Sequence, residues 1–219
     1  MTKKHNFICF DMDGTLLETH LDIASSINSI LRENGLNEIP AEIQRGFRHF
    51  RLKPFVMDCL NYLGVYSVDL AIKVYDAHCE NYKEFMLQEG KPFDGIPEVL
   101  AALKESGRSI SVLTAKPKFF AEQELAHWFP SIEFDFIHGA EIGTAKKPRK
   151  EFLNPFLEKF NPKLEEIIYI GDTYNDYLFA QNAGIDFVGV TWGYDNDKEM
   201  ARNANAVLCH SPAELLNIL

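Results

Sequence analysis

Two aspartates stand two positions apart directly after a short apolar run near the N-terminus. The run Asn6–Phe10 is followed by Asp11 and Asp13, and Gly14 comes next. Side chains at i and i+2 of a strand point to the same side, and a glycine permits a tight turn behind them. We expect both carboxylates at the carboxyl end of a strand, where open α/β sheets bind ligands. A simple Asp-Gly turn is the alternative, but the pattern D-x-D-G-T arises by accident in only on the order of one such chain in a thousand.

A second acidic pair follows another apolar run, Ile167–Ile170. Asp172 and Asp176 stand four residues apart, where a loop would enter a helix. Four carboxylates at one edge of a sheet would repel one another unless a cation neutralised them, and carboxylate oxygens suit Mg²⁺. The sequence therefore predicts a Mg²⁺ site at this edge. The alternative is that Thr173 or Asn175 caps the helix and that the aspartates complement its dipole.

Two smaller elements add hydrogen-bond donors and positive charge between the acidic pairs. Thr114 and Ala115 follow an apolar run, where a hydroxyl and a backbone turn can donate hydrogen bonds to a phosphoryl oxygen. Lys147 precedes Pro148 and is therefore held extended, so that it can reach the same edge. A strand-terminal threonine without a function and a solvated basic run are the alternatives.

These motifs stand at the ends of short apolar runs that alternate with helical patterns, which is typical of a parallel sheet with crossover helices. Helices are expected at 96–107, from 117 towards 128, and after Ser211, where Glu214 would complete a capping box. The predicted fold class is α/β, with a doubly wound, Rossmann-like parallel sheet. Its expected strands are Asn6–Phe10, Ser109–Leu113, Phe134–Ile137, Ile167–Ile170, Phe187–Val190 and Ala206–Leu208.

The region between Leu16 and Gly90 breaks this alternation. Apolar residues recur there at intervals of three or four, and no strand is convincing. Helices expected at roughly 21–34, 41–50, 54–64 and 67–89 form an all-helical insertion, which is far longer than an ordinary crossover. We expect two domains, an α/β core of residues 1–15 and 91–219 and a helical domain of residues 16–90.

Composition fits a globular protein and excludes several classes. The 219 residues are 46% hydrophobic and 25% charged, which argues against intrinsic disorder. No run approaches the roughly 18 apolar residues of a membrane span, and the N-terminal apolar run ends at Asp11, so a cytoplasmic protein without a secretory signal is expected. Four scattered cysteines without a CxxC pair favour free core thiols over a disulfide framework or a zinc site.

The net charge is unevenly distributed. A formal charge of −10 argues against nucleic acid as a partner, and it disfavours phosphorylated ligands unless the acidity is interrupted. Segments 45–53, 116–118 and 146–150 hold 10 of the 22 lysine and arginine residues and no acidic residue. Positive charge is therefore concentrated near the motifs that are expected to bind phosphate.

Taken in order, the motifs resemble those of the haloacid dehalogenase superfamily of phosphotransferases, and they span nearly the whole chain. The opening DMDGTLLETHLDIASSINSILRENGL, the segment Thr114–Pro117, Lys147-Pro148 and the GDTxxD motif at Gly171–Asp176 are similar to phosphoglycolate-phosphatase-like members. The helical insertion is similar in place and size to the helical cap of that family, which implies a role in substrate specificity. The chain departs from the subgroup at Glu18, where aspartate is usual, and at Arg149-Lys150, where alanine and proline are common.

The resemblance implies a Mg²⁺-dependent phosphatase that works through an aspartyl phosphate. Asp11 would be the nucleophile, and Asp13 would protonate the leaving group and then deprotonate the attacking water. Mg²⁺ would be held by Asp11, the backbone carbonyl of Asp13 and Asp172. Asp176 would be a further ligand or an anchor for Lys147.

The remaining site residues would bind the phosphoryl group. Thr114, with Ala115, would hold a nonbridging oxygen, and Lys147 would balance charge on the nucleophile and the phosphoryl group. Lys146 competes for that role, but the following Pro148 favours Lys147. The partner would be a small phosphorylated metabolite rather than nucleic acid or a membrane, and the protein would be a monomer or a homodimer.

Substrate choice is expected to lie in the cap. One or two of Arg45, Arg48 and Arg51 would meet an anionic leaving group, although a solvated helix face explains the pattern equally well. A phosphoglycolate-like phosphomonoester is the expected substrate, with a sugar-phosphate mutase or a nucleotide or pyrophosphate phosphatase as alternatives. A catalytically idle, partner-binding protein is the more distant alternative. Dehalogenase activity is disfavoured because the dehalogenases of the family lack an acid at the position of Asp13.

Overall fold

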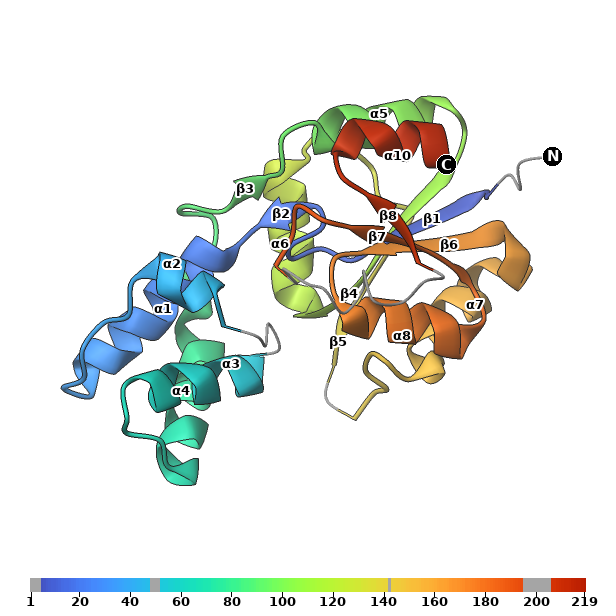
Figure 1. The fold of residues 1–219 in the computed structure, drawn as a ribbon. Coiled ribbons are helices and arrows are strands. Elements are labelled where there is room, and N and C mark those ends of the chain that lie inside the picture. Colours follow the sequence, from blue (N-terminus) through green and yellow to red (C-terminus); the bar gives the residue numbers. More distant parts are fainter. Residues whose placement is uncertain (1–4, 48–51, 142, 195–205) are drawn as a thin grey trace. The chain divides into compact units, whose positions relative to one another are not determined.

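The computed structural model describes residues 5–47, 52–141, 143–194 and 206–219 (Figure 1). The chain divides into two compact units, one of Met1–Glu18 and Pro92–Leu219 and the other of Thr19–Lys91. The first boundary lies three residues after the expected one and the second lies one residue after it. Leu16 and Leu17 explain the first shift, because both are fully buried in the core of the sheet unit.

A six-stranded sheet, parallel throughout, is the centre of the first unit in the described residues, and its order is β5-β4-β1-β6-β7-β8. This order confirms the doubly wound α/β fold. Phe10 is aligned with Val112 on one side and with Ile170 on the other, so three strands run in register up to the end of β1. The strands are β1 (Phe7–Phe10), β4 (Ser109–Pro117), β5 (Phe136–Ala140), β6 (Ile167–Gly171), β7 (Asp186–Val190) and β8 (Val207–Cys209).

Helices cover both faces of the sheet, because alternate side chains of each strand point to opposite faces. Ile8 and Phe10 lie in one core cluster with α5 (Ile96–Glu105), α6 (Lys118–Trp128) and α10 (Pro212–Ile218). Cys9 lies in a second cluster with the helices of the other face. These are η2 (Lys150–Leu153), α7 (Asn154–Phe160) and α8 (Tyr174–Ala183), and η3 (Leu164–Glu166) precedes β6.

The second unit is helical and has its own core. Ile27 and Ile30 pack with Val56, Leu60 and Val74, all of them at most 1% exposed. Where the chain passes between the units, β2 (Leu17–Glu18) and β3 (Lys91–Pro92) form a two-stranded sheet. The helices are α1 (His20–Glu33), α2 (Ala41–Arg45), α3 (Leu52–Tyr62), α4 (Val68–Asn81) and η1 (Tyr82–Glu84).

The last helix predicted in this unit, 67–89, is too long. α4 ends at Asn81, and Leu87 has a φ of 71°, which is left-handed backbone. The buried carboxylate of Asp22 accepts hydrogen bonds from the backbone N–H groups of Leu87 (3.1 Å) and Glu89 (2.8 Å). This carboxylate stabilises a turn in place of the helix.

Other expectations need smaller corrections. β2 and β3 were missed because two-residue strands leave no alternating pattern. The capping box at the last helix is wrong: the Ser211 side chain caps no N–H, and Glu214 accepts a hydrogen bond from the His210 backbone at 2.8 Å. In the described parts of the chain, no helix is both long and apolar enough to cross a membrane.

Candidate active site

Three carboxylates meet at the carboxyl ends of β1 and β6. Asp11 directly follows β1, Asp172 directly follows β6, and Asp176 lies in the first turn of α8. One oxygen of each carboxylate lies within 4.8 Å of the others. The three residues are 7%, 0% and 0% exposed, so their charges are withdrawn from water. The alignment of Phe10 with Ile170 produces this meeting, because it makes neighbouring parallel strands end together.

Lys147 lies within this cluster. Its Nζ is 2.9 Å from Asp11 Oδ1 and 2.6 Å from Asp176 Oδ1, and it donates a hydrogen bond to the Tyr169 hydroxyl at 2.9 Å. Lys147 is buried, whereas Lys146 is exposed. The structure therefore brings Lys147, and not its neighbour, to the carboxylates.

Tyr169 was missed in the sequence, because on an apolar strand it reads as a core residue. It is fully buried on β6, and its hydroxyl donates to the carbonyl oxygen of Leu113 at 2.7 Å. The hydroxyl thereby joins Leu113 of β4 to the lysine, which restricts the movement of Lys147 away from the cluster.

Asp172 is held by groups from two other segments. Thr15 Oγ1 donates to its Oδ1 at 3.1 Å, and the backbone N–H of Tyr194 donates to its Oδ2 at 2.8 Å. A Cβ at Gly193 would collide with the Asp172 side chain and with the carbonyl oxygen of Gly14. The segment after β7 can therefore approach this carboxylate only with a glycine at position 193. This contact was not predicted, because no sequence motif indicates it.

The helix-capping alternative for the second acidic pair also holds. Thr173 is the N-cap of α8, and its Oγ1 accepts a hydrogen bond from the Asp176 N–H at 3.3 Å. The Asp176 carboxylate accepts one in return from the Thr173 N–H at 3.0 Å, which completes a capping box. Asp176 can cap the helix and belong to the cluster at the same time. The Thr173 N–H donates to its Oδ2, and the Lys147 ammonium donates to its Oδ1.

The carboxylate of Asp13 is not part of the group that Asp11, Asp172 and Asp176 form, although its charge still acts on Asp11. Its Oδ1 is 2.9 Å from the Nζ of Lys116, and that Nζ is 2.7 Å from Oε2 of Glu124. The reason is the backbone, since β1 ends at Phe10 and the chain turns at Gly14 with a φ of 81°. Alternation of side chains along a strand therefore does not extend to Asp13.

The phosphate-binding candidates differ in their surroundings. Thr114 is 1% exposed near the end of β4, and its Oγ1 accepts a hydrogen bond from the Lys116 N–H at 3.2 Å. Ala115 is exposed between them. Among the candidate arginines, Arg45 is partly buried on α2, whereas Arg48 and Arg51 lie outside the described residues.

The charges in the cluster do not balance by themselves. Burial raises the pKa of Asp11 to about 7, against the opposing effect of Lys147 and with further increases from Asp176 and Asp13. Burial also raises the pKa of Asp172 well above its usual value, and Asp176 and Asp11 add to the increase. Burial opposes the charge on Lys147, but Asp11 and Asp176 raise its pKa above the usual value. Three carboxylates against one ammonium leave an excess of negative charge that suits a divalent cation bound by oxygen.

A Mg²⁺ titration at two pH values tests this charge balance. The pKa of Asp11 rises from 3.8 to about 7 in the folded protein, so the metal-free fold holds the proton more tightly than the unfolded chain does. Metal-free protein should therefore lose stability as the pH rises through this window, and a cation that binds the ionised carboxylates should restore it. We expect the increase in Tm on adding Mg²⁺ to be several degrees larger at pH 8 than at pH 5. Equal increases at the two pH values would contradict this expectation.

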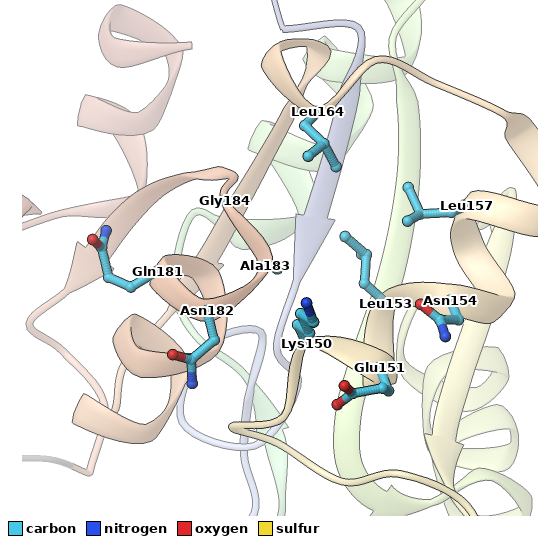
Figure 2. A pocket seen from close by; sticks show the side chains of 10 residues that line it. All are labelled: Lys150, Glu151, Leu153, Asn154, Leu157, Leu164, Gln181, Asn182, Ala183 and Gly184. Atoms are coloured by element: carbon cyan, nitrogen blue, oxygen red, sulfur yellow. The ribbon is translucent and has the colours of Figure 1, made fainter.

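A groove elsewhere in the sheet unit contains none of the candidate site residues. It has a volume of about 440 Å³ and is lined by residues of η2, α7, η3 and the carboxyl end of α8. Figure 2 shows Leu153, Leu157 and Leu164 on one side of it and Gln181 and Asn182 on the other. The carboxylate cluster is therefore the candidate site, and the groove is separate from it.

Comparison with known proteins assigns the family. Residues 8–190 match the family described as haloacid dehalogenase-like hydrolase. The chain belongs to this family. The resemblance noted from the four motifs is thereby confirmed.

Individual relatives agree with this membership of the hydrolase family. The 5′-nucleotidase of Pseudomonas aeruginosa is 29% identical over 215 residues, which are 97% of this chain and 94% of that protein. The phosphoglycolate phosphatase of Vibrio parahaemolyticus is 27% identical over 216 residues, 97% of this chain and 95% of that protein. A crystal structure from Lactobacillus delbrueckii subsp. bulgaricus shares the fold with a TM-score of 0.89 at 23% identity, over 99% of both chains. The predicted reaction class, phosphoric monoester hydrolysis, is confirmed by the family and these phosphatase relatives.

Proposed function

We propose that this hydrolase is a Mg²⁺-dependent phosphatase that cleaves a small phosphomonoester through an aspartyl phosphate. The observation that carries the proposal is the buried cluster of Asp11, Asp172 and Asp176 with Lys147 at 2.9 Å and 2.6 Å from two of its members. A cluster of this kind is costly to bury, and it concentrates a nucleophile, a cation site and a positive charge at one sheet edge.

Asp11 is the nucleophile in this proposal. Its carboxylate attacks phosphorus, and the bond from phosphorus to the leaving oxygen breaks, which divides one difficult hydrolysis into two easier steps. Lys147 orients the Asp11 carboxylate and offsets charge as the phosphoryl group approaches. The hydroxyl and neighbouring backbone of Thr114 bind a nonbridging oxygen, together with the backbone of Ala115.

Asp13 moves the protons in both steps. It donates a proton to the leaving oxygen in the first step and accepts one from the attacking water in the second. Its separation from the carboxylate cluster supports this division of labour, because its carboxylate is bound to Lys116 instead. Water then replaces Asp11 on phosphorus, and inorganic phosphate is released.

The cation would be held by Asp11, Asp172 and the backbone carbonyl of Asp13, with Asp176 as a further candidate. Bound Mg²⁺ would neutralise charge on the phosphoryl oxygens and on the carboxylates. Thr15 and the Tyr194 N–H keep the Asp172 carboxylate oriented for that role. Second-sphere contacts of this kind fix the direction of a ligand before the metal arrives.

The substrate we favour is phosphoglycolate-like, as in the Vibrio parahaemolyticus relative. The Pseudomonas aeruginosa relative makes a nucleoside monophosphate the second candidate. We propose that the helical unit Thr19–Lys91 acts as the specificity cap and that one or two of Arg45, Arg48 and Arg51 supply the positive charge for the leaving group. A cytoplasmic location and a monomeric or homodimeric state stay predictions.

A substrate panel tests the proposed function. Phosphoglycolate, a nucleoside 5′-monophosphate, a sugar phosphate and pyrophosphate are each incubated with the protein in Mg²⁺ or in EDTA, and released phosphate is measured. We expect turnover only with Mg²⁺, with the highest kcat/KM for phosphoglycolate. Release of phosphate in EDTA would contradict the metal dependence, and no release from any of the four with Mg²⁺ would overturn the proposal.

A further inference from the structure

One buried acid of the sheet unit has no part in the chemistry proposed above. Glu124 lies on α6 with its side chain 1% exposed, and its Oε2 is 2.7 Å from Lys116 Nζ. The same Nζ is 2.9 Å from Oδ1 of Asp13, whose side chain is 25% exposed. The three groups therefore form a chain that runs from the helix layer to the acid proposed to transfer protons.

Stability does not explain this arrangement. Removing a lysine and a glutamate from water costs several kcal/mol for each ion, and apolar residues at such positions are often equally stabilising or more so. The neighbours of Glu124 on the same helix, Ala121 and Leu125, are buried apolar residues of the core. An acid at position 124 is consequently better explained by what it does to Lys116.

The pair has a geometric consequence for Asp13. A lysine side chain has four flexible carbons, so its ammonium is not fixed by the backbone alone. Glu124 fixes the ammonium of Lys116 from the helix side, and the ammonium in turn holds one oxygen of Asp13. With Oδ1 held in this way, the Asp13 carboxylate is kept in one orientation for proton exchange with a leaving group.

We propose that Glu124, acting through Lys116, is a positioning residue for Asp13. The inference rests on the proposed phosphatase function. As the bond from phosphorus to the leaving oxygen breaks and Asp11 bonds to phosphorus, the Asp13 carboxyl group gives its proton to the leaving oxygen. The Asp13 carboxylate regains a proton from the water that releases phosphate from Asp11, so the cycle balances.

Leaving-group chemistry separates this role from a structural one. An alkoxide must be protonated as it leaves, whereas p-nitrophenolate is stable as an anion and needs no acid. The kcat/KM value reports the steps up to phosphorylation of the enzyme, and a positioned general acid contributes roughly 10²-fold or more. We expect Glu124→Gln to lower kcat/KM about 10-fold or more for an alkyl phosphate and by less than about 3-fold for p-nitrophenyl phosphate.

Matched variants complete the experiment. Lys116→Met should show the same selectivity for the alkyl phosphate, because it removes the link that Glu124 fixes. Lys104→Met breaks the ion pair of Lys104 with Asp135, whose atoms are 3.1 Å apart in the same unit, and should leave the ratio of the two kcat/KM values unchanged. If Glu124→Gln does not fold by circular dichroism, the double variant Glu124→Met/Lys116→Met replaces the pair by apolar side chains and is measured instead.

The outcomes distinguish the inference from the function on which it rests. A selective loss on the alkyl phosphate in Glu124→Gln or in the double variant supports the positioning role. An equal loss on both substrates, or none, in a folded variant overturns that role while the phosphatase activity stands. A wild-type protein that turns over neither substrate with Mg²⁺ overturns the proposed function and the inference together.

Discussion

Asp11→Asn should lower phosphate release by roughly 10³-fold or more with the fold intact. An amide oxygen does not form the acyl phosphate, so the first chemical step is lost rather than slowed. A generic aryl phosphate with Mg²⁺ gives the rate, and circular dichroism gives the fold. Equal turnover by the two proteins would exclude Asp11 as the nucleophile.

The same substitution should not weaken the metal-free protein at pH 8. Burial and neighbouring acids raise the pKa of Asp11 to about 7, so its charge opposes folding at that pH. A neutral amide of the same shape removes this cost, although it weakens the contact with Lys147. We expect the Tm without metal to be unchanged or higher, and the increase on adding Mg²⁺ to be smaller. Asp94→Asn, at an exposed position of the same unit, is the control and should change neither quantity.

Lys147→Met should damage both activity and stability. Removing one partner of a buried ion pair costs about 3–5 kcal/mol, because the remaining charge is left without compensation. Here Asp11 and Asp176 both lose the ammonium within 3 Å of them. We expect a fall in Tm of roughly 6–20 °C in the metal-free protein, at about 2–4 °C per kcal/mol, and a fall in kcat of roughly 10²-fold or more.

Lys146→Met is the matched control for this prediction. The two lysines are adjacent in the sequence, but Lys146 is exposed and Lys147 is buried. Lys146→Met should leave kcat and Tm close to the wild-type values. Comparable losses of kcat and Tm in the two variants would mean that the contacts of Lys147 in the cluster do not contribute to activity or stability.

Much of the fold could be predicted because its elements are simple. The strands β1 and β6 are short apolar runs that end in acidic motifs, and both were located to within a residue. β5 spans Phe136–Ala140, so it begins two residues later and ends three residues later than predicted. An apolar run shows that a strand is present better than it shows the strand's bounds, because apolar residues can pack beside a strand without pairing in it.

The part of the candidate site that could be predicted consists of residues whose motif directly follows a strand. Asp11 and Asp172 directly follow strands, so parallel pairing alone brings them together. The contacts of Lys116, Glu124 and Tyr169 depend on side chains that meet across different elements of the fold, and no local spacing encodes such meetings. Lys116 was counted in the sequence only as one of several positive charges near the phosphate-binding motifs.

The two-stranded sheet of β2 and β3 has a consequence for how this protein can change. Leu17–Glu18 leads into the helical unit and Lys91–Pro92 leads out of it, and because these segments are paired, the two ends of the insertion are neighbours. An insertion whose ends meet can be shortened, lengthened or exchanged for another without moving the strands on either side. On the proposed role of the helical unit as the specificity cap, substrate range would diverge by exchange of this one insertion while the carboxylates of the sheet unit stay as they are.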